Sequence, residues 1–409
     1  MAIKRFRNAR PRLLAPSRIL RPTVPQTGGG REREELVEQA GKAIARGSKS
    51  FAVASRLFDR ATRERAWLLY AWCRRCDDIA DGQEFGGKLG DQADAENRIQ
   101  ALRALTRRAL DGQPTADPAF DALGQVAQEA GLTLQMAEDV IGGFQLDAEG
   151  WQPHSEADLM RYCYHVAGAI GVMMARVMGV EDHEEDVLDR ACDLGIAFQL
   201  VNIARDVSED DAAGRCYLPR EWLAEADIPP GEPMKPGHRP ALVRLVARLI
   251  DLAEVYEASA RRGIETLSYR QRWAVLAAAN IYMGIGEKVR ARGPVAWDRR
   301  ARTSRREKLA AVFKGFMEAF DPPQAIDRPP PYSRAQLLIA VRMEQPIPPP
   351  PMTPLPDEGV SPTPKGEGDH AQHGGGAPSA VPDLARPEEP HVPLPHPSHG
   401  PPPRSGEDL

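Results

Sequence analysis

Two stretches decide the fold of this chain: YAWCRRCDDIAD at residues 70–81 and QLVNIARDVSED at residues 199–210. Both have the period of an amphipathic helix, at about 100° per residue. In the first stretch, four polar side chains fall within roughly 60° of one another; they form the first acidic row, namely Tyr70, Arg74, Asp77 and Asp81. In the second, four fall within roughly 80°; they form the second acidic row, namely Gln199, Asn202, Asp206 and Asp210.

The same helical period continues through most of residues 32–320, with Pro and Gly mainly between the periodic segments. No alternating pattern long enough for a strand occurs there. The sequence therefore predicts an all-α fold of about ten helices around one core. The expected helices cover residues 33–45, 59–81, 94–110, 118–130, 133–142, 156–179, 183–210, 241–266, 268–291 and 303–320.

Composition divides the chain into three zones. Residues 1–31 form an Arg-rich arm without acids, which we interpret as disordered, although its composition also resembles a transit peptide. Residues 32–320 form the helical domain. Residues 321–409 hold most of the 38 prolines and are expected to be a disordered tail. Within that tail, residues 335–343 are apolar enough to pack on the core.

Charge, cysteines and hydropathy exclude several classes of protein. The net charge of −5 argues against a nucleic-acid-binding protein. An odd number of cysteines, five, without a secretory signal predicts reduced thiols in a cytosolic protein. Cys73 and Cys76 have the spacing of a redox or zinc pair, but no second pair completes such a site. No apolar run approaches the ~18 residues of a membrane span, so the protein is expected to be soluble or peripheral to a membrane.

The two acidic rows suggest a common site. Carboxylates four residues apart repel one another, so a cation should compensate them. If the rows face each other, five side chains supply the oxygen ligands that Mg²⁺ prefers, with phosphate oxygens completing the shell: Asp77, Asp81, Asn202, Asp206 and Asp210. Arg74 would hold a phosphate, and Tyr70 and Gln199 would orient it. The alternative is a pair of surface helices with acidic faces.

Four segments resemble the squalene/phytoene synthase family, in its bacterial carotenogenic branch. They are GSKSF (47–51), the first stretch above, YCYHVAG (162–168) and FQLVNIARDVSEDDAAGRCYLP (198–219). They occur in the family's order, and the likeness covers roughly residues 40–320. The resemblance implies an isoprenoid-synthase helical bundle with a central apolar cavity. It also implies head-to-head condensation of two geranylgeranyl diphosphates, through prephytoene diphosphate, to phytoene, with release of diphosphate.

The resemblance also implies cofactors and site residues. About two or three Mg²⁺ or Mn²⁺ ions would bridge the diphosphate, and no NADPH is expected. The metal positions are those named above, and Asp77, Asp81, Asp206, Asp210, Tyr70 and Arg74 would be catalytic. Substrate-binding positions are Ser48, Ser50, Tyr70, Arg74, Gln199, Arg205 and Tyr282, with Arg299 a weaker match.

Some of these residues have a second interpretation. At about 100° per residue, Arg205 and Asp78 lie off their rows, and Arg205 lies roughly 100° from Asp206 around the helix. A buried ion pair is therefore an alternative role for Arg205. Ser48 and Ser50 have the residue type of a helix N-cap. The small and apolar residues 166–174 would line a dry pocket or pack helices closely. We expect His165 to be packed or hydrogen bonded rather than a base, because released diphosphate can take the proton.

Three rival functions remain open on sequence alone. The first is a squalene or dehydrosqualene synthase using farnesyl diphosphate. The second is a non-catalytic assembly factor of the same family, which would be expected to have lost acidic residues. The third is a purely structural bundle, which leaves both rows unexplained. For an enzyme with such apolar substrates and products we expect transient contact with a membrane surface, while the oligomeric state stays undetermined.

Overall fold

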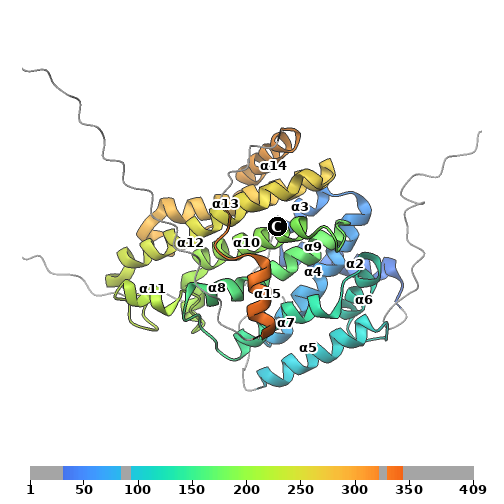
Figure 1. Ribbon diagram of the computed structural model, residues 1–409, viewed down its shortest axis with the longest axis horizontal. Coiled ribbons are helices and arrows are strands. Elements are labelled where there is room, and N and C mark those ends of the chain that lie inside the picture. The colour runs from blue at the N-terminus through green and yellow to red at the C-terminus, as the bar shows by residue number, and fades with distance from the viewer. Residues whose placement is uncertain (1–30, 84–93, 322–328, 344–409) are drawn as a thin grey trace, which may run out of the picture. The chain divides into compact units, whose positions relative to one another are not determined.

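The computed structural model describes residues 31–83, 94–321 and 329–343, and these form helices with no strand among them (Figure 1). The arm up to residue 30 and the tail beyond residue 343 lie outside the described residues. The helices are α2 (Arg33–Gly47), α3 (Lys49–Ala54), α4 (Arg60–Ala80), α5 (Ala95–Leu110), α6 (Pro118–Ala130), α7 (Leu134–Ala148), α8 (Glu156–Cys163), α9 (Ala169–Val177), α10 (Glu185–Ala212), α11 (Arg220–Glu225), α12 (Arg239–Ala260), α13 (Tyr269–Arg292), α14 (Arg305–Phe320) and α15 (Arg334–Met343).

Local capping explains where the expected helices begin. The Asp59 carboxylate accepts a hydrogen bond from the backbone N–H of Thr62 at 3.0 Å and so caps α4. Ser155 and Ser304 open α8 and α14 with capping boxes. All ten expected helices are present, and the prediction of an all-α fold is confirmed. The short α3 and α11 were not expected, because six residues are too few for a periodic pattern to show.

Helix α10 lies in the middle of the helical unit, in contact with α9, α12 and α13 (Figure 1). The middle of the helix, residues 195–204, is apolar apart from Gln199 and Asn202, and Ile196, Leu200 and Val201 are fully buried. A helix that is apolar all round is stable only when other helices surround it. The second acidic row therefore lies at the polar end of a buried helix.

Glycines let α9 and α10 pack at very short range. A Cβ atom on Gly171 would overlap the carbonyl oxygen of Ala191, and one on Gly195 would overlap the carbonyl oxygen of Ala167. A π-helical turn, Tyr164–Gly168, joins α8 to α9 just before this crossing. Close packing is therefore the role of these two glycines. For Gly171, this agrees with the close-packing interpretation of residues 166–174.

The predicted start of the disordered tail needs correction. Residues Arg334–Met343 form α15, in which Leu337 and Ala340 are buried. The Arg334 guanidinium donates to the carboxylate of Asp189 on α10 at 2.6 Å, and Tyr256 donates to the carbonyl of Tyr332 at 3.0 Å. The apolar patch at 335–343 thus packs on the core, so the boundary at residue 320 was set too early by the prolines around it.

None of the helices in the described ranges is long and apolar enough to cross a membrane.

Candidate active site

The first acidic row lies at the C-terminal end of α4. Arg74 donates to Asp77 at 2.9 Å and also pairs with Asp78 at 3.0 Å, one turn further along. Asp78 is buried beneath the row, whereas Asp77 is partly buried and Asp81 is the C-cap residue of the helix. Arg74 is therefore fixed by two carboxylates of its own helix, and Asp78, which lies off the row, helps to position it.

The second acidic row is held by two arginines at Asp206. Arg300, beyond α13, donates from Nε and Nη2 to the two carboxylate oxygens of Asp206 at 2.8 and 2.7 Å. Arg205 donates from Nε to the same carboxylate at 2.7 Å, with a second bond from its Nη2. The Arg205 side chain thus curls back to its neighbour, which explains how a residue off the row reaches it.

The two rows face each other in the fold. Arg215, just after α10, donates to Asp81 at the end of α4 at 2.7 Å. A third acid, Asp147 near the end of α7, lies close enough to repel Asp77, Asp81 and Asp210. The backbone N–H of Arg215 also donates to the carbonyl of Asp210 at 2.8 Å, so this arginine links the C-terminal ends of the two rows. At their other ends, Tyr70 and Gln199 line the same cavity.

Asp147 is the centre of a cluster that sequence reasoning did not assign. Tyr217 donates to its carboxylate at 2.8 Å, and Tyr162 donates at 3.1 Å. The rings of Tyr162 and Tyr217 stack with centroids 4.7 Å apart. Tyr162 lies in the YCYHVAG segment, which was a usable signal. Arg215 and Tyr217 lie in the 198–219 segment, which gave the same kind of signal, whereas Asp147 is a single polar residue without a pattern.

The carboxylates of the two rows differ in pKa. Burial, reinforced by neighbouring acids, raises the pKa of Asp77 to about 6. Burial and the charge of Asp206 raise the pKa of Asp210 to about 7. Burial also acts on Asp206, but hydrogen bonds from Arg205 and Arg300 outweigh it and lower the pKa below its usual value. Crowded carboxylates of raised pKa are the ones that a bound cation would stabilise.

The donor set fits a divalent metal only in part. The oxygens in the two rows are hard ligands of the type that Mg²⁺ binds. In the described ranges, however, no three acidic, histidine or cysteine side chains converge on a point where they alone could hold a metal ion. Arginines occupy the space between several of the carboxylates. Substrate diphosphate would therefore have to supply part of the coordination shell.

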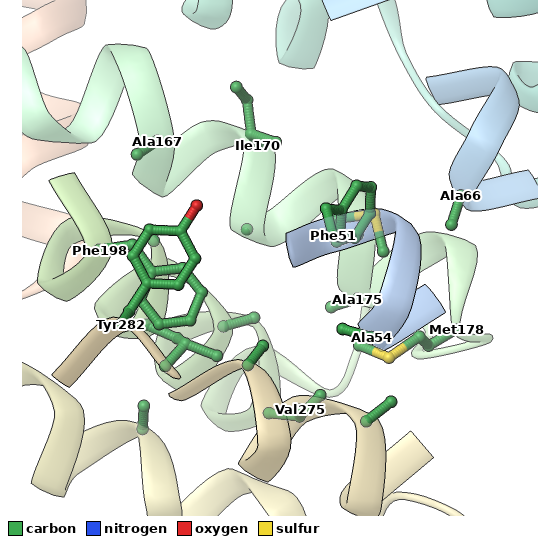
Figure 2. Close-up of a pocket in the computed structure, with 18 of the residues that line it drawn as sticks. Phe51, Ala54, Ala66, Ala167, Ile170, Ala175, Met178, Phe198, Val275 and Tyr282 are labelled. Atoms are coloured by element: carbon green, nitrogen blue, oxygen red, sulfur yellow. The ribbon is translucent and has the colours of Figure 1, made fainter. Parts of the chain in front are cut away.

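A largely apolar cavity of about 390 Å³ begins at the N-terminal side of these rows. It extends along α10 from Asn202 to Val187, a distance of about 22 Å at 1.5 Å per residue. Its walls include Val166, Ile170 and Met174, so the second interpretation of residues 166–174 also holds. Figure 2 shows the ring of Tyr282 lying over Phe198, with centroids 4.1 Å apart.

Polar predicted residues gather at one end of this cavity: Ser48, Tyr70, Gln199 and Asn202. The Ser48 hydroxyl accepts from the backbone N–H of Phe51 at 3.3 Å, so Ser48 is both an N-cap and part of the wall. A Cβ on Gly47 would overlap the Tyr70 hydroxyl. The Ser50 side chain lies outside what the structure describes.

Other predicted residues lie apart from the cavity. Arg299 is exposed, and its backbone carbonyl accepts a hydrogen bond from Arg292 at 3.0 Å. Its neighbour Arg300 contacts Asp206 instead. A phosphate-binding role for Arg299 therefore stays a prediction. His165 is buried, with Nδ1 2.6 Å from the carbonyl oxygen of Asp139, as expected for a hydrogen-bonded histidine. Cys73, which does line the cavity, and Cys76 are free thiols, and burial raises the pKa of both.

Known proteins match about two thirds of this chain. The family model for squalene/phytoene synthases matches residues 44–307. A phytoene synthase from Pseudescherichia vulneris is 49% identical over 68% of this chain and 90% of its own length. A 15-cis-phytoene synthase from Pantoea ananas is 44% identical over 69% of this chain and 92% of its own.

Solved structures show the same fold. A dehydrosqualene synthase, 25% identical, superposes with a TM-score of 0.61 over 69% of this chain and 96% of that one. A squalene synthase from Alicyclobacillus acidocaldarius, 23% identical, has a TM-score of 0.56 over 64% and 95% of the two chains. From the matched residues, the relatives and the shared helical fold together, we conclude that this chain belongs to the squalene/phytoene synthase family.

Proposed function

We propose that this chain is a phytoene synthase, a prenyltransferase that joins two geranylgeranyl diphosphates head to head through prephytoene diphosphate. The observation that supports this most directly is the junction of two opposed acidic rows with a deep apolar cavity. The rows suit a charged headgroup, and the cavity suits its prenyl chain. The names of the relatives at 44–49% identity point to phytoene as the product.

The side chains of the rows would bind the headgroup from two sides. Asp77, Asp81, Asn202, Asp206 and Asp210 would hold Mg²⁺ or Mn²⁺ together with the diphosphate. Bound metal would supply Lewis-acid stabilisation of the departing diphosphate.

The arginines already in the site would share the negative charge of that diphosphate. The Arg205 and Arg300 guanidiniums, now on Asp206, can turn one N–H face to phosphate oxygens. Tyr70, at the polar end of the cavity, would orient the headgroup.

The cavity would protect the allylic cation that forms when diphosphate leaves. Its wall along α9, α10 and α13 is built almost entirely from apolar side chains, which exclude water. The stacked rings of Phe198 and Tyr282 present π-electrons to a nearby cation. The last step loses a proton, and the released diphosphate is basic enough to accept it, so no side-chain base is required.

The second candidate is dehydrosqualene formation from farnesyl diphosphate, because a dehydrosqualene synthase shares the fold. One assay separates the candidates. Purified protein is incubated with geranylgeranyl or farnesyl diphosphate and Mg²⁺, with and without NADPH, and the hydrocarbon is identified by mass. We expect phytoene from geranylgeranyl diphosphate without NADPH. Squalene or dehydrosqualene as the main product would overturn the assignment.

Phytoene and the prenyl chains of the substrates are strongly apolar, so the proposed function includes contact with a lipid surface, from which substrate arrives and to which product leaves.

The metal requirement is tested in the same assay by a chelator, which should abolish turnover until Mg²⁺ or Mn²⁺ is restored.

A further inference from the structure

Helix α14 carries a row of large apolar side chains that point into solvent. Leu309, Phe313, Met317 and Phe320 recur every three or four residues and are 69%, 64%, 54% and 65% exposed. We refer to these four residues as the α14 apolar face. Isolated exposed apolar residues are ordinary, but a row along one helix indicates a surface that meets something apolar.

The opposite side of α14 is fixed, so this face cannot turn inward. Gly315 touches the backbone of Ala277 on α13 so closely that a Cβ would not fit. The Trp273 indole donates to the carbonyl of Val312 at 2.8 Å, and Ala319 is buried. Among the described helices, α14 packs extensively only on α13, at the edge of the helical unit (Figure 1). The apolar face is therefore a stable feature of the surface.

Within α14, the charges nearest the face are positive, and the nearest acid is the exposed C-cap residue Asp321 beside Phe320. Arg306 lies within about 20° of Phe313 around the helix, whereas Glu307 and Glu318 lie about 120° or more away. Both acids are already paired, Glu307 with Lys288 at 2.6 Å and Glu318 with Arg261 at 3.4 Å. Within the part of the chain that the structure describes, Arg305 and Arg306 are exposed and no carboxylate pairs with them. The face thus combines apolar side chains with unpaired positive charge.

The face is also continuous with the cavity. Ile264, Leu267 and Val275 line the cavity and belong to the apolar cluster around Ala319 of α14. Outward from this cluster, the ring of Tyr269 lies 4.6 Å from that of Phe320, centroid to centroid. Apolar side chains therefore extend without interruption from the end of the cavity farthest from the acidic rows to the surface of α14.

We propose that the α14 apolar face docks on an anionic lipid bilayer, with Arg305 and Arg306 at the headgroups and the apolar side chains in the interface. A basic amphipathic helix that lies in the plane of the membrane has this combination of features. The inference deepens the proposed function, on which it rests for the apolar substrate, by naming the surface that meets lipid. It places the far end of the cavity next to the bilayer.

Vesicle flotation tests the apolar part of the proposal. The full chain is mixed with vesicles of phosphatidylcholine and phosphatidylglycerol, and the partition coefficient is measured. Phe313→Glu should lower it roughly 10- to 100-fold, because a large side chain can no longer leave water. Ile339→Glu on α15 is the matched control, an exposed apolar residue on another helix that should bind as the wild type does. Circular dichroism checks that both variants keep their helices.

The charge part is tested by the double substitution Arg305→Gln with Arg306→Gln. It should lower the partition coefficient roughly 10- to 30-fold on the mixed vesicles. On phosphatidylcholine alone it should change little. Wild-type binding that is equal on both vesicle types would overturn the choice of an anionic surface.

Failure of docking and failure of the proposed function give different results. In detergent micelles, Phe313→Glu should make hydrocarbon at the wild-type rate, because the residue is remote from both acidic rows. Equal flotation of the wild type and Phe313→Glu, or equal losses in Phe313→Glu and Ile339→Glu, would overturn the docking surface. So would a wild-type dimer in sedimentation that Phe313→Glu dissociates, since the face would then be an interface between two copies.

Discussion

The two acidic rows have the same four-residue carboxylate spacing but different surroundings. On α4, Asp77 shares Arg74 with Asp78, and its pKa is raised to about 6. On α10, Asp206 receives two guanidiniums and has a lowered pKa. One turn further, Asp210 has a pKa raised to about 7. Two arginines therefore compensate Asp206, whereas Asp77 and Asp210 have raised pKa values and would be stabilised by a further cation.

This difference teaches that spacing identifies a carboxylate row but not its charge balance. The pairing of Asp206 depends on Arg300, 94 residues away in the chain, and the crowding of Asp210 depends on Asp147 of α7. We infer that Asp206 organises the phosphate-binding arginines while Asp77 and Asp210 have most to gain from metal. The predictions below test this division.

The largest effect is expected for Asp206→Asn. Loss of this carboxylate removes a metal ligand and releases two arginines, so kcat/KM for hydrocarbon formation should fall roughly 10²- to 10³-fold. Turnover is measured at saturating Mg²⁺, and circular dichroism serves as the folding control. Turnover close to that of the wild type would remove Asp206 from the site.

A smaller effect is expected for Arg300→Gln, with Arg299→Gln as its neighbouring control. Arg300 reaches Asp206 and Arg299 is exposed, so kcat/KM should fall roughly 10- to 100-fold in the first variant and change little in the second. The reverse order would support the sequence-based assignment of Arg299 and contradict the role given to Arg300.

Stability separates the two carboxylates of α10. In metal-free protein, Asp206→Asn should lower the free energy of unfolding by roughly 1–3 kcal/mol, because the half-buried Arg205 and the more exposed Arg300 lose a charged partner. Asp210→Asn removes repulsion from Asp206 and Asp147 and should stabilise the fold by about 1 kcal/mol or less. Urea unfolding in the presence of a chelator measures both. Equal losses would show that the rows are not divided in this way.

The smallest effect concerns how α4 positions Tyr70. Gly47→Ala places a methyl group where the Tyr70 hydroxyl lies, so KM should rise a few-fold and stability should fall by roughly 1–2 kcal/mol. Gly284→Ala on α13 is the control, since nothing lies within 4 Å of the added methyl group. A Gly47→Ala variant with unchanged KM would mean that Tyr70 can move without cost to binding.

Much of the fold could be predicted because its signals are local. Helix period, Asp59 and the capping serines Ser155 and Ser304 act over a few residues, and they located all ten expected helices. The same locality placed residues 334–343 in a tail because of the surrounding prolines, although the apolar pattern that packs Leu337 into the core was visible there. Burial of that helix depends on α8 and α10, which no window of neighbouring residues contains.

For this protein, the sequence alone determined the helical class, the two acidic rows, the apolar stretch at residues 166–174 and the family likeness. Each of these depends on a pattern among residues that are close together in the chain. The tertiary structure decided that Arg215 joins the rows, that Asp147 lies among their carboxylates, and that Arg300 rather than Arg299 reaches Asp206. The physical reason is that charge compensation depends on distance in space. Packing alone brings residues from α4, α7, α10 and the segment after α13 within a few ångströms of one another.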